Sequence, residues 1–282
     1  MEVFKTKREM RSRLDSASPV RPEIGLVPTM GALHRGHLAL VERALGENEL
    51  VVVSIFVNPT QFNRKEDLET YPKALGRDLE MLNKVSDKLL VFAPEVDEMY
   101  GTDVSSRSYN FEGLEKVMEG LFRPGHFNGV GTIVEELLWL ILPNKAYFGE
   151  KDFQQLQIIR KLVATRNIPV EIIGCPIVRE NGGLALSSRN ERLSTPIRKE
   201  ASFIYKTLRA AKGKFGTKSA HYVVNWVRQQ FRTHPHLDLE YVEIADVETL
   251  TPVVRKKRDR KYRAFIAAYA NGVRLIDNIA LN

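Results

Sequence analysis

Residues 24–37 read IGLVPTMGALHRGH, and this stretch decides the fold class. Its first six residues are mostly apolar and predict a buried strand. The apolar residues that come after it share one helical face and predict a helix: Leu40, Val41, Ala44 and Leu45. Two glycines and two histidines lie between the strand and the helix. A strand that leads through such a loop into a helix is typical of an open α/β sheet, which binds ligands at the carboxyl ends of its strands.

The same alternation of strand and helix patterns continues to about residue 175. Short apolar runs predict further strands, and their continuity indicates a parallel sheet buried on both faces: 50–57, 89–92, 146–149 and 170–173. Apolar stripes at helical spacing lie between them, among them Leu75, Leu79 and Leu82, and also Val130, Ile133, Val134, Leu137, Leu138 and Ile141. Residues 1–176 are therefore predicted to form an α/β domain, a Rossmann-like doubly wound parallel sheet.

The pattern changes after Pro176. Residues 177–179 and 184–187 flank Glu180-Asn181-Gly182-Gly183, which predicts a hairpin. Asn271-Gly272 joins the last two predicted strands and is a strong hairpin signal. The remaining pattern predicts helices at 196–212 and 219–233 and strands at 238–245, 263–270 and 273–277. Residues 177–282 are thus expected to form a smaller C-terminal α+β domain.

Composition places the chain among ordinary globular proteins, with 43% hydrophobic and 27% charged residues. No apolar run approaches the roughly 20 residues that span a bilayer, and residues 1–16 lack a signal-peptide core. We therefore expect no membrane partner and a cytoplasmic location. The single cysteine, Cys175, excludes an intramolecular disulfide and a cysteine-rich metal site, and its apolar flanks indicate a buried residue.

Much of the net charge of +7 comes from one segment, residues 255–263, which holds seven basic residues and one acidic residue. Such a run can bind nucleic acid by releasing counterions. A solvated loop is the simpler interpretation, because no zinc module or aromatic platform accompanies the run. We therefore expect no nucleic-acid partner and keep that function as an alternative.

His34 and His37 lie three residues apart at the predicted start of the first helix. That spacing places both imidazoles on one side, near the N–H groups of the first turn, a corner that favours phosphate. His37 could donate a hydrogen bond to charge that develops on a phosphate. A zinc pair or a purely structural pair are the alternatives. Zinc needs a third ligand, and the other histidines form no matching cluster: His126, His221, His234 and His236.

Four further segments carry polar residues at positions where a strand ends or a helix begins. Gln61 follows the second strand and suits a substrate with hydroxyl and carboxylate groups. Lys151 and Gln155 are four residues apart and are expected to share a helical face after the strand at 146–149. Ser187-Ser188-Arg189-Asn190 combines hydroxyls and a guanidinium, which suits either a phosphate cradle or a helix cap. Arg123 in Arg123-Pro124-Gly125-His126-Phe127 is a further candidate.

These segments, taken together and in this order, resemble the pantoate–β-alanine ligase family. The resemblance runs from Val27-Pro28-Thr29-Met30-Gly31 through Val57-Asn58-Pro59, Arg123–Phe127 and Gly149-Glu150-Lys151-Asp152. It continues through Leu186–Asn190 to Arg274-Leu275-Ile276-Asp277-Asn278 and so covers nearly the whole chain. Each motif alone is weak, but the set is highly specific.

The resemblance implies an ATP-dependent ligase that joins (R)-pantoate to β-alanine and releases AMP and pyrophosphate, with Mg²⁺ required and a homodimer as the usual assembly. It implies that Gln61 and Gln155 hold pantoate and that His37 is the acid-type catalytic residue. From their charges and donors we expect His34, Lys151, Ser187, Ser188 and Arg189 to take part in catalysis as well, and Arg123 to bind substrate. The resemblance also implies an ATP site made of Met30, Gly31, Ala32, Leu33, His34, Arg35, Gly36, His37, Gly149, Glu150, Lys151, Asp152, Val178, Leu186, Ser187, Ser188 and Arg189. The metal ligands are not identified.

Two departures from the family pattern are visible. Arg35 stands where the family carries an acidic residue, and we expect its side chain to face solvent. The segment after Tyr100 is slightly shortened, which should affect a loop alone. The charge pattern is consistent with a pantoyl-adenylate intermediate that a closing C-terminal lid protects from water. An adenylyltransferase, which keeps AMP in its product, is the alternative enzyme.

Overall fold

The computed structural model describes residues 1–16 and 22–282. The chain divides into two compact units, which are described separately. The first contains Met1–Glu115, Glu119–Glu150 and Gln155–Pro176, and the second contains Lys116–Met118, Lys151–Gln154 and Ile177–Asn282.

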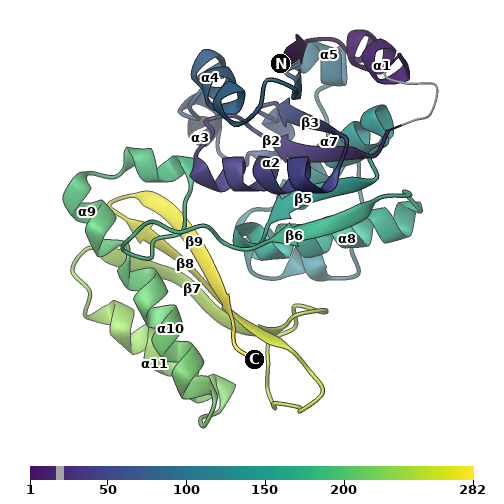
Figure 1. The fold of residues 1–282 in the computed structure, drawn as a ribbon. Coiled ribbons are helices and arrows are strands. Elements are labelled where there is room, and N and C mark those ends of the chain that lie inside the picture. Colours follow the sequence, from purple (N-terminus) through teal and green to yellow (C-terminus); the bar gives the residue numbers. More distant parts are fainter. Residues whose placement is uncertain (17–21) are drawn as a thin grey trace. The chain divides into compact units, whose positions relative to one another are not determined.

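The first unit is built on a parallel sheet of six strands in the order β1-β4-β3-β2-β5-β6. The strands are β1 (Glu2–Phe4), β2 (Ile24–Thr29), β3 (Leu50–Ile55), β4 (Leu90–Phe92), β5 (Lys145–Gly149) and β6 (Glu171–Cys175). The predicted α/β class is therefore confirmed (Figure 1). The predicted strands differ in their ends, and the edge strand β1, which pairs with β4, was not predicted.

Helices and short helical turns connect these strands. They are α1 (Lys7–Asp15), α2 (Arg35–Glu47), η1 (Pro59–Gln61), α3 (Lys65–Glu69), α4 (Leu75–Val85), α5 (Val96–Tyr100), η2 (Leu114–Lys116), α6 (Glu119–Phe122), α7 (His126–Ile141), η3 (Glu150–Asp152) and α8 (Phe153–Arg166). No helix of the described residues is long and apolar enough to cross a membrane.

Both faces of the sheet are covered, which explains the continuous apolar runs in its strands. Val27 and Val53 join one hydrophobic cluster with Val41 of α2 and Leu82 of α4. The neighbouring residue Leu26 points to the opposite face by the alternation of a strand, and it too is fully buried. Burial on two faces is the usual state of a parallel sheet, and it leaves the strand ends as the accessible edge.

The second unit holds an antiparallel sheet of three strands, β7 (Leu237–Asp246), β8 (Tyr262–Ala270) and β9 (Val273–Ala280), in that order. It also holds η4 (Ser188–Arg192), α9 (Thr195–Glu200), α10 (Phe203–Phe215) and α11 (Ala220–Arg232). The predicted Asn271-Gly272 turn joins β8 and β9, and both of its residues have positive φ. The predicted helix at 196–212 is corrected, because the chain divides it into α9 and α10.

Candidate active site

The strand order reverses at β2, and predicted site residues lie at this reversal. From β2 the chain moves through β3 to β4 on one side, whereas β5 pairs with β2 on its other side. Open parallel sheets bind ligands beyond the carboxyl ends of their strands at such a point. The loop after β2 holds residues 30–34, and Gly149 ends β5. Two of the predicted nucleotide segments therefore lie at the edge where this fold binds ligands.

His34 and His37 stack on each other at the start of α2. Their ring centroids are 4.0 Å apart and their planes are inclined by 26°. The N–H of Gly36 donates to Nδ1 of His34 at 3.1 Å, and the N–H of His34 donates to Nδ1 of His37 at 3.3 Å. A ring nitrogen that accepts a hydrogen bond carries no proton, so each neutral imidazole carries its proton on Nε2. The backbone thus selects the tautomer in which Nε2 is the donor.

We expected the N–H groups of this corner to be available to a phosphate, and for most of them that is wrong. The two histidine rings use the N–H groups of His34 and Gly36. The N–H of Gly31 donates to Oγ1 of Thr29 at 3.2 Å. The N–H groups of Ala32 and Leu33 donate hydrogen bonds to the carboxylate of Asp78. The corner is therefore suited to hold phosphate through its side chains.

The loop after β3 brings Gln61 to Met30. Nε2 of the buried Gln61 lies 2.6 Å from Sδ of Met30. Asn58, which is 1% exposed, donates from Nδ2 to Oε1 of Gln61 at 3.2 Å and to the main-chain oxygen of Gly129 at 3.1 Å. The hydroxyl of Tyr100 donates to Oδ1 of Asn58 at 2.5 Å. The buried side chain of Asn58 thus sets the orientation of the Gln61 amide. Asn58 is itself fixed by hydrogen bonds at both Nδ2 and Oδ1.

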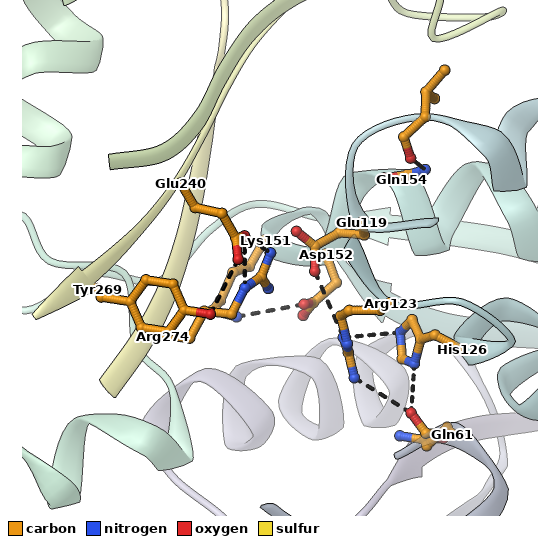
Figure 2. A network of polar contacts seen from close by, with 11 residues as sticks. Gln61, Glu119, Arg123, His126, Lys151, Asp152, Gln154, Glu240, Tyr269 and Arg274 are labelled. Carbon is orange, nitrogen blue, oxygen red and sulfur yellow. Dashed lines mark hydrogen bonds and ion pairs between the residues drawn. The ribbon is translucent and has the colours of Figure 1, made fainter. Parts of the chain in front are cut away.

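Arg123 also acts on Gln61, but on its main chain. Figure 2 shows Arg123 and His126 pointing to the main-chain oxygen of Gln61, at 3.4 Å from Nη2 and 2.8 Å from Nδ1. Nη1 of Arg123 lies 3.1 Å from Nε2 of His126, and its ion pair with Glu119 spans 3.6 Å. Because an arginine only donates, Nε2 of His126 accepts and its Nδ1 donates to the carbonyl. The motif at 123–127 therefore supports the loop that carries Gln61.

Lys151 lies in η3, directly after β5. Its ammonium pairs with Asp152 at 3.5 Å (Figure 2). Its main-chain oxygen accepts a hydrogen bond from Nδ2 of Asn278 at 2.9 Å. Next to it, Nε2 of Gln154 donates to the main-chain oxygen of Val117 at 2.8 Å. Lys151 lies in η3, which ends at Asp152, and Gln155 lies in α8, which begins at Phe153, so the two residues belong to consecutive helical segments.

Val178 and Leu186 lie on a short hairpin. The N–H of Leu186 donates to the main-chain oxygen of Val178 at 3.0 Å, and the two arms form a bridge at Arg179 and Ala185. The predicted hairpin is therefore confirmed, with one bridge between its arms. Gly183, with φ of +96°, closes the turn, and a Cβ there would lie 2.4 Å from the ring of Tyr205. A side chain at this position would be strained and would clash with that ring.

The hairpin is held by β9. Nη1 and Nη2 of Arg179 donate to the two carboxylate oxygens of Asp277, at 2.6 and 2.9 Å. The guanidinium also lies over the ring of Tyr205, 3.7 Å from its centroid. Burial raises the pKa of Asp277, and the adjacent Arg179 opposes that rise. This bidentate ion pair fixes Arg179, which is next to Val178, and so fixes the start of the hairpin.

Ser187 caps η4, the turn that holds the other predicted phosphate ligands. Its hydroxyl accepts from the N–H of Arg189 at 3.3 Å. Asn190 is buried and donates to Oε1 of Glu180 and to the main-chain oxygen of Ala185. The capping interpretation of this segment is therefore confirmed. Ser188 and Arg189 are partly exposed at the start of the turn.

Arg35 faces solvent, as expected. Its side chain is 62% exposed and its Nη1 lies 2.5 Å from Oε1 of Glu42. The acidic partner lies on the same helix, so the basic side chain at this position is balanced locally.

Several residues at these segments were not predicted. Asn58 and Asn278 lie in motifs of the family resemblance but were given no role, and Tyr100 was not a candidate; all three act through contacts between distant parts of the chain. Asp78 left a signal, because it interrupts the apolar stripe of Leu75, Leu79 and Leu82 with a carboxylate. An acidic residue on the buried face of a helix needs a partner, and that partner is the loop after β2.

Comparison with known proteins places this geometry in a described group. The model of the family described as "Pantoate-beta-alanine ligase" matches residues 2–280. A pantothenate synthetase of Christiangramia forsetii is 58% identical over 282 residues, which cover all of both chains. A pantothenate synthetase of Flavobacterium psychrophilum is 50% identical over 281 residues, again over all of both chains.

Solved structures agree with these matches. A crystal structure of pantothenate synthetase from Thermus thermophilus has a TM-score of 0.92 and 42% identity, with 100% of this chain and 99% of that chain covered. A crystal structure of pantoate-β-alanine ligase from Francisella tularensis, complexed with β-γ ATP and β-alanine, has a TM-score of 0.81 and 35% identity. It covers 100% of this chain and 98% of that chain.

Proposed function

From the premise that the chain belongs to the pantoate–β-alanine ligase family, we propose how its own residues carry out the ATP-dependent condensation of pantoate with β-alanine. The chain is an enzyme of the AMP-forming carbon–nitrogen ligase class. In the first step a carboxylate oxygen of pantoate attacks the α-phosphorus of ATP. The bond from that phosphorus to the bridging oxygen breaks, and pyrophosphate leaves with the electron pair. The product is pantoyl-adenylate.

In the second step the free amine of β-alanine attacks the acyl carbon of this mixed anhydride. The bond from that carbon to the phosphate oxygen breaks, AMP leaves, and the amine loses one proton as the amide forms. Neither step needs a nucleophile from the protein. The catalytic contribution of the chain is to orient the two reacting groups and to stabilise the negative charge that moves between phosphate oxygens.

The stacked histidine pair supplies donors for that charge. Backbone N–H groups donate to Nδ1 of both His34 and His37, so the proton of each neutral ring is on Nε2. These Nε2–H groups are the proposed donors to phosphate oxygens. Lys151, Ser187, Ser188 and Arg189 add an ammonium, two hydroxyls and a guanidinium. The other contacts that we propose for ATP come from Met30, Gly31, Ala32, Leu33, Arg35, Gly36, Gly149, Glu150, Asp152, Val178 and Leu186.

Pantoate is held by amides in this proposal. Gln61 and Gln155 each offer a donor and an acceptor, which matches a substrate with hydroxyls and a carboxylate. Arg123 contributes through the main chain of Gln61, which its guanidinium and His126 support. Residues 1–176 would thus bind nucleotide and pantoate, and residues 177–282 would serve as a lid. A smaller radius of gyration by X-ray scattering when ATP and pantoate are bound would test the lid role.

The Mg²⁺ that the family resemblance implies can be bound without a site made entirely of protein ligands. Among the residues that the structure describes, no three His, Cys, Asp or Glu side chains form a group that could hold a metal ion. Mg²⁺ keeps several waters and is commonly bound by substrate phosphates with one or two carboxylates. We therefore propose that Mg²⁺ arrives with ATP, where it would neutralise phosphate charge. Loss of activity in EDTA, with recovery on adding Mg²⁺, tests this requirement.

Assembly and location are also proposals. The resemblance to the family supports a homodimer in the cytoplasm, and light scattering of the purified chain measures its assembly directly. Of the alternative functions, an adenylyltransferase is not favoured by the family match. Nucleic-acid binding is not favoured by that match either, and a steep salt dependence of RNA or DNA affinity would be needed to revive it.

One observation carries the proposed site most directly. The loops after β2 and β3 bring Met30 and Gln61 into contact, and the first of these loops ends at the histidine pair. The test is to add pantoate, β-alanine and ATP to the purified chain and to separate the products. We expect AMP and pantothenate in equal amounts, with neither formed when one substrate is omitted. A product that retains AMP would overturn the assignment in favour of adenylyl transfer.

A further inference from the structure

Asp78 is a buried acid that bonds to the loop ahead of the histidine pair. It lies on α4 and is 1% exposed. Its Oδ2 accepts from the N–H of Ala32 at 2.9 Å, and its Oδ1 accepts from the N–H of Leu33 at 2.7 Å. Each carboxylate oxygen therefore holds one of two successive amides. Charge-assisted bonds of this kind are among the strongest that a loop can receive.

The backbone of the loop is shaped to receive this anion. Gly31 and Ala32 have positive φ values of 78° and 49°. Successive N–H groups in such a conformation form a concave arrangement that binds anions, and in many proteins that anion is a phosphate. A Cβ at Gly31 would lie 2.9 Å from Oδ2 of Asp78 and 3.1 Å from Cγ2 of Ile55. Glycine at this position is thus required both by its φ and by the close carboxylate.

The position of Asp78 on its helix is poorly explained by stability alone. It occurs within the apolar stripe of α4, where Leu82 is fully buried. Burial of a carboxylate is costly, and an apolar residue of similar size at such a site often gives an equal or more stable fold. What the carboxylate adds is a defined shape for residues 31–33. That loop connects Met30 to the imidazoles of His34 and His37.

We propose that Asp78 is a positioning residue for the ligase reaction, because it fills the anion-binding loop itself and thereby fixes the histidine pair. The N–H groups of Ala32 and Leu33 already donate to Asp78. The ATP phosphates therefore bind to the imidazoles and not to these two N–H groups. This inference rests on the proposed function. It assigns the residue a role in orientation, and it gives the residue no contact with substrate.

The test compares Asp78→Asn with Glu80→Gln. Both changes remove one negative charge from α4, but Glu80 is exposed and lies outside the site. The amide that Asp78→Asn introduces would offer an acceptor to one N–H and a donor to the other, so one loop bond is lost. We expect kcat for pantoate-dependent pyrophosphate exchange to fall about 10- to 100-fold. The KM for β-alanine in the full reaction should stay unchanged, and Glu80→Gln should match the unaltered chain.

A spectroscopic measurement separates positioning from simple support of the fold. The ring signals of His34 and His37 in nuclear magnetic resonance spectra should shift in Asp78→Asn and stay in place in Glu80→Gln. Unshifted ring signals, or a lower melting temperature with kcat retained, would overturn the proposal. Amide exchange in the unaltered chain covers the case in which Asp78→Asn does not fold. Protection of Ala32 and Leu33 like that of β2 supports the proposal, and exchange at the rate of an open loop overturns it.

These outcomes are distinct from failure of the proposed function. If the unaltered chain forms no AMP from pantoate, β-alanine and ATP, the ligase assignment itself fails. If it does form AMP and Asp78→Asn behaves like the control, the ligase assignment stands and the positioning role is wrong.

Discussion

The side-chain amide of Asn278 donates to the main-chain oxygen of Lys151 at 2.9 Å, although 127 residues separate the two in sequence. Asn278 is 2% exposed, and its Oδ1 accepts from Nη1 of Arg263. Its neighbour Asp277 holds Arg179. The motif at 274–278 therefore supports two segments that we propose to contact ATP, and its residues need not touch the nucleotide themselves.

Asn278→Ala should weaken ATP binding. The change leaves the main-chain oxygen of Lys151 without this donor, a loss of about 1–3 kcal/mol in a buried setting. We expect the KM for ATP to rise while the KM for pantoate stays within about twofold of its starting value, since only an ATP-contacting segment loses its support. Steady-state kinetics with each substrate varied in turn would show the difference.

Asn282→Ala is the matched control for this change. Its Nδ2 likewise donates to a main-chain oxygen, that of Arg260, at 2.8 Å. An equal rise in the KM for ATP in both variants would contradict a specific role for Asn278.

The basic run at 255–263 should not be neutralised as a block. Arg263 is buried on β8, its guanidinium lies 3.9 Å from the ring centroid of Phe153, and Lys256 donates to the main-chain oxygen of Phe215 at 2.6 Å. The expectation of a solvated loop is therefore wrong at Arg263, whereas Lys256 is exposed although its ammonium bonds to the main chain. The exposed residues Arg255, Lys257 and Arg258 fit it.

Changing Arg255, Lys257 and Arg258 together to serine should leave ligase activity nearly intact, because these side chains are exposed and lie outside the proposed site. Arg263→Ala should lower stability by about 1–3 kcal/mol, since it strips a buried partner from Asn278. Activity assays and urea unfolding check the two expectations. A large fall in kcat for the well-folded triple variant would mean that the loop has a catalytic role.

Gln61→Ala and Gln155→Ala should weaken the binding of pantoate far more than the binding of ATP. Each change leaves a polar group of pantoate without its partner, at a cost of about 1–3 kcal/mol. Asn58→Asp should resemble Gln61→Ala, because the carboxylate cannot donate to Oε1 of Gln61 as Nδ2 of Asn58 does. Binding titrations with each ligand separate these effects, and an equal loss of ATP affinity would count against both assignments.

His37→Asn and His37→Ala should differ in stability but show the same loss of catalytic activity. Nδ1 of His37 caps the N–H of His34, and Oδ1 of an asparagine can take its place. Alanine cannot, so His37→Ala should lose about 1 kcal/mol of stability. Neither variant has the Nε2–H donor.

Pyrophosphate exchange into ATP, with pantoate present and β-alanine absent, should therefore fall about 10²- to 10³-fold in both variants. Urea denaturation reports the difference in stability. Exchange that persists in His37→Asn would limit this residue to capping the helix. Exchange that strictly requires β-alanine, in the unaltered chain, would instead indicate a concerted reaction without an adenylate.

Cys175 should react slowly with thiol reagents in the folded chain. It is 4% exposed, and burial raises the pKa of its thiol despite the nearby guanidinium of Arg43. Because the thiolate is the reactive form, labelling at about pH 8 should be slower than in denaturant and should accelerate as the pH rises further. Mass spectrometry of timed samples measures both rates. Equal rates in folded and unfolded chains would show that the thiol is accessible.

The sequence by itself determined the class of the fold and the location of most of the proposed site. Continuous apolar runs such as 50–57 require a sheet that is covered on both faces, and Asn271-Gly272 requires a tight turn. The histidine spacing before α2 likewise follows from local order. These features depend on periodicity and on backbone conformation, which neighbouring residues set among themselves.

Only the tertiary structure decided which groups meet. The contact of Gln61 with Met30, the hold of Asn278 on Lys151 and the carboxylate of Asp78 in the loop at 31–33 each join segments that are far apart in sequence. The contact of Asp78 also decided that the N–H groups of Ala32 and Leu33 serve one of the protein's own side chains. Such pairings follow from strand order and close packing, and the local sequence pattern records neither of these.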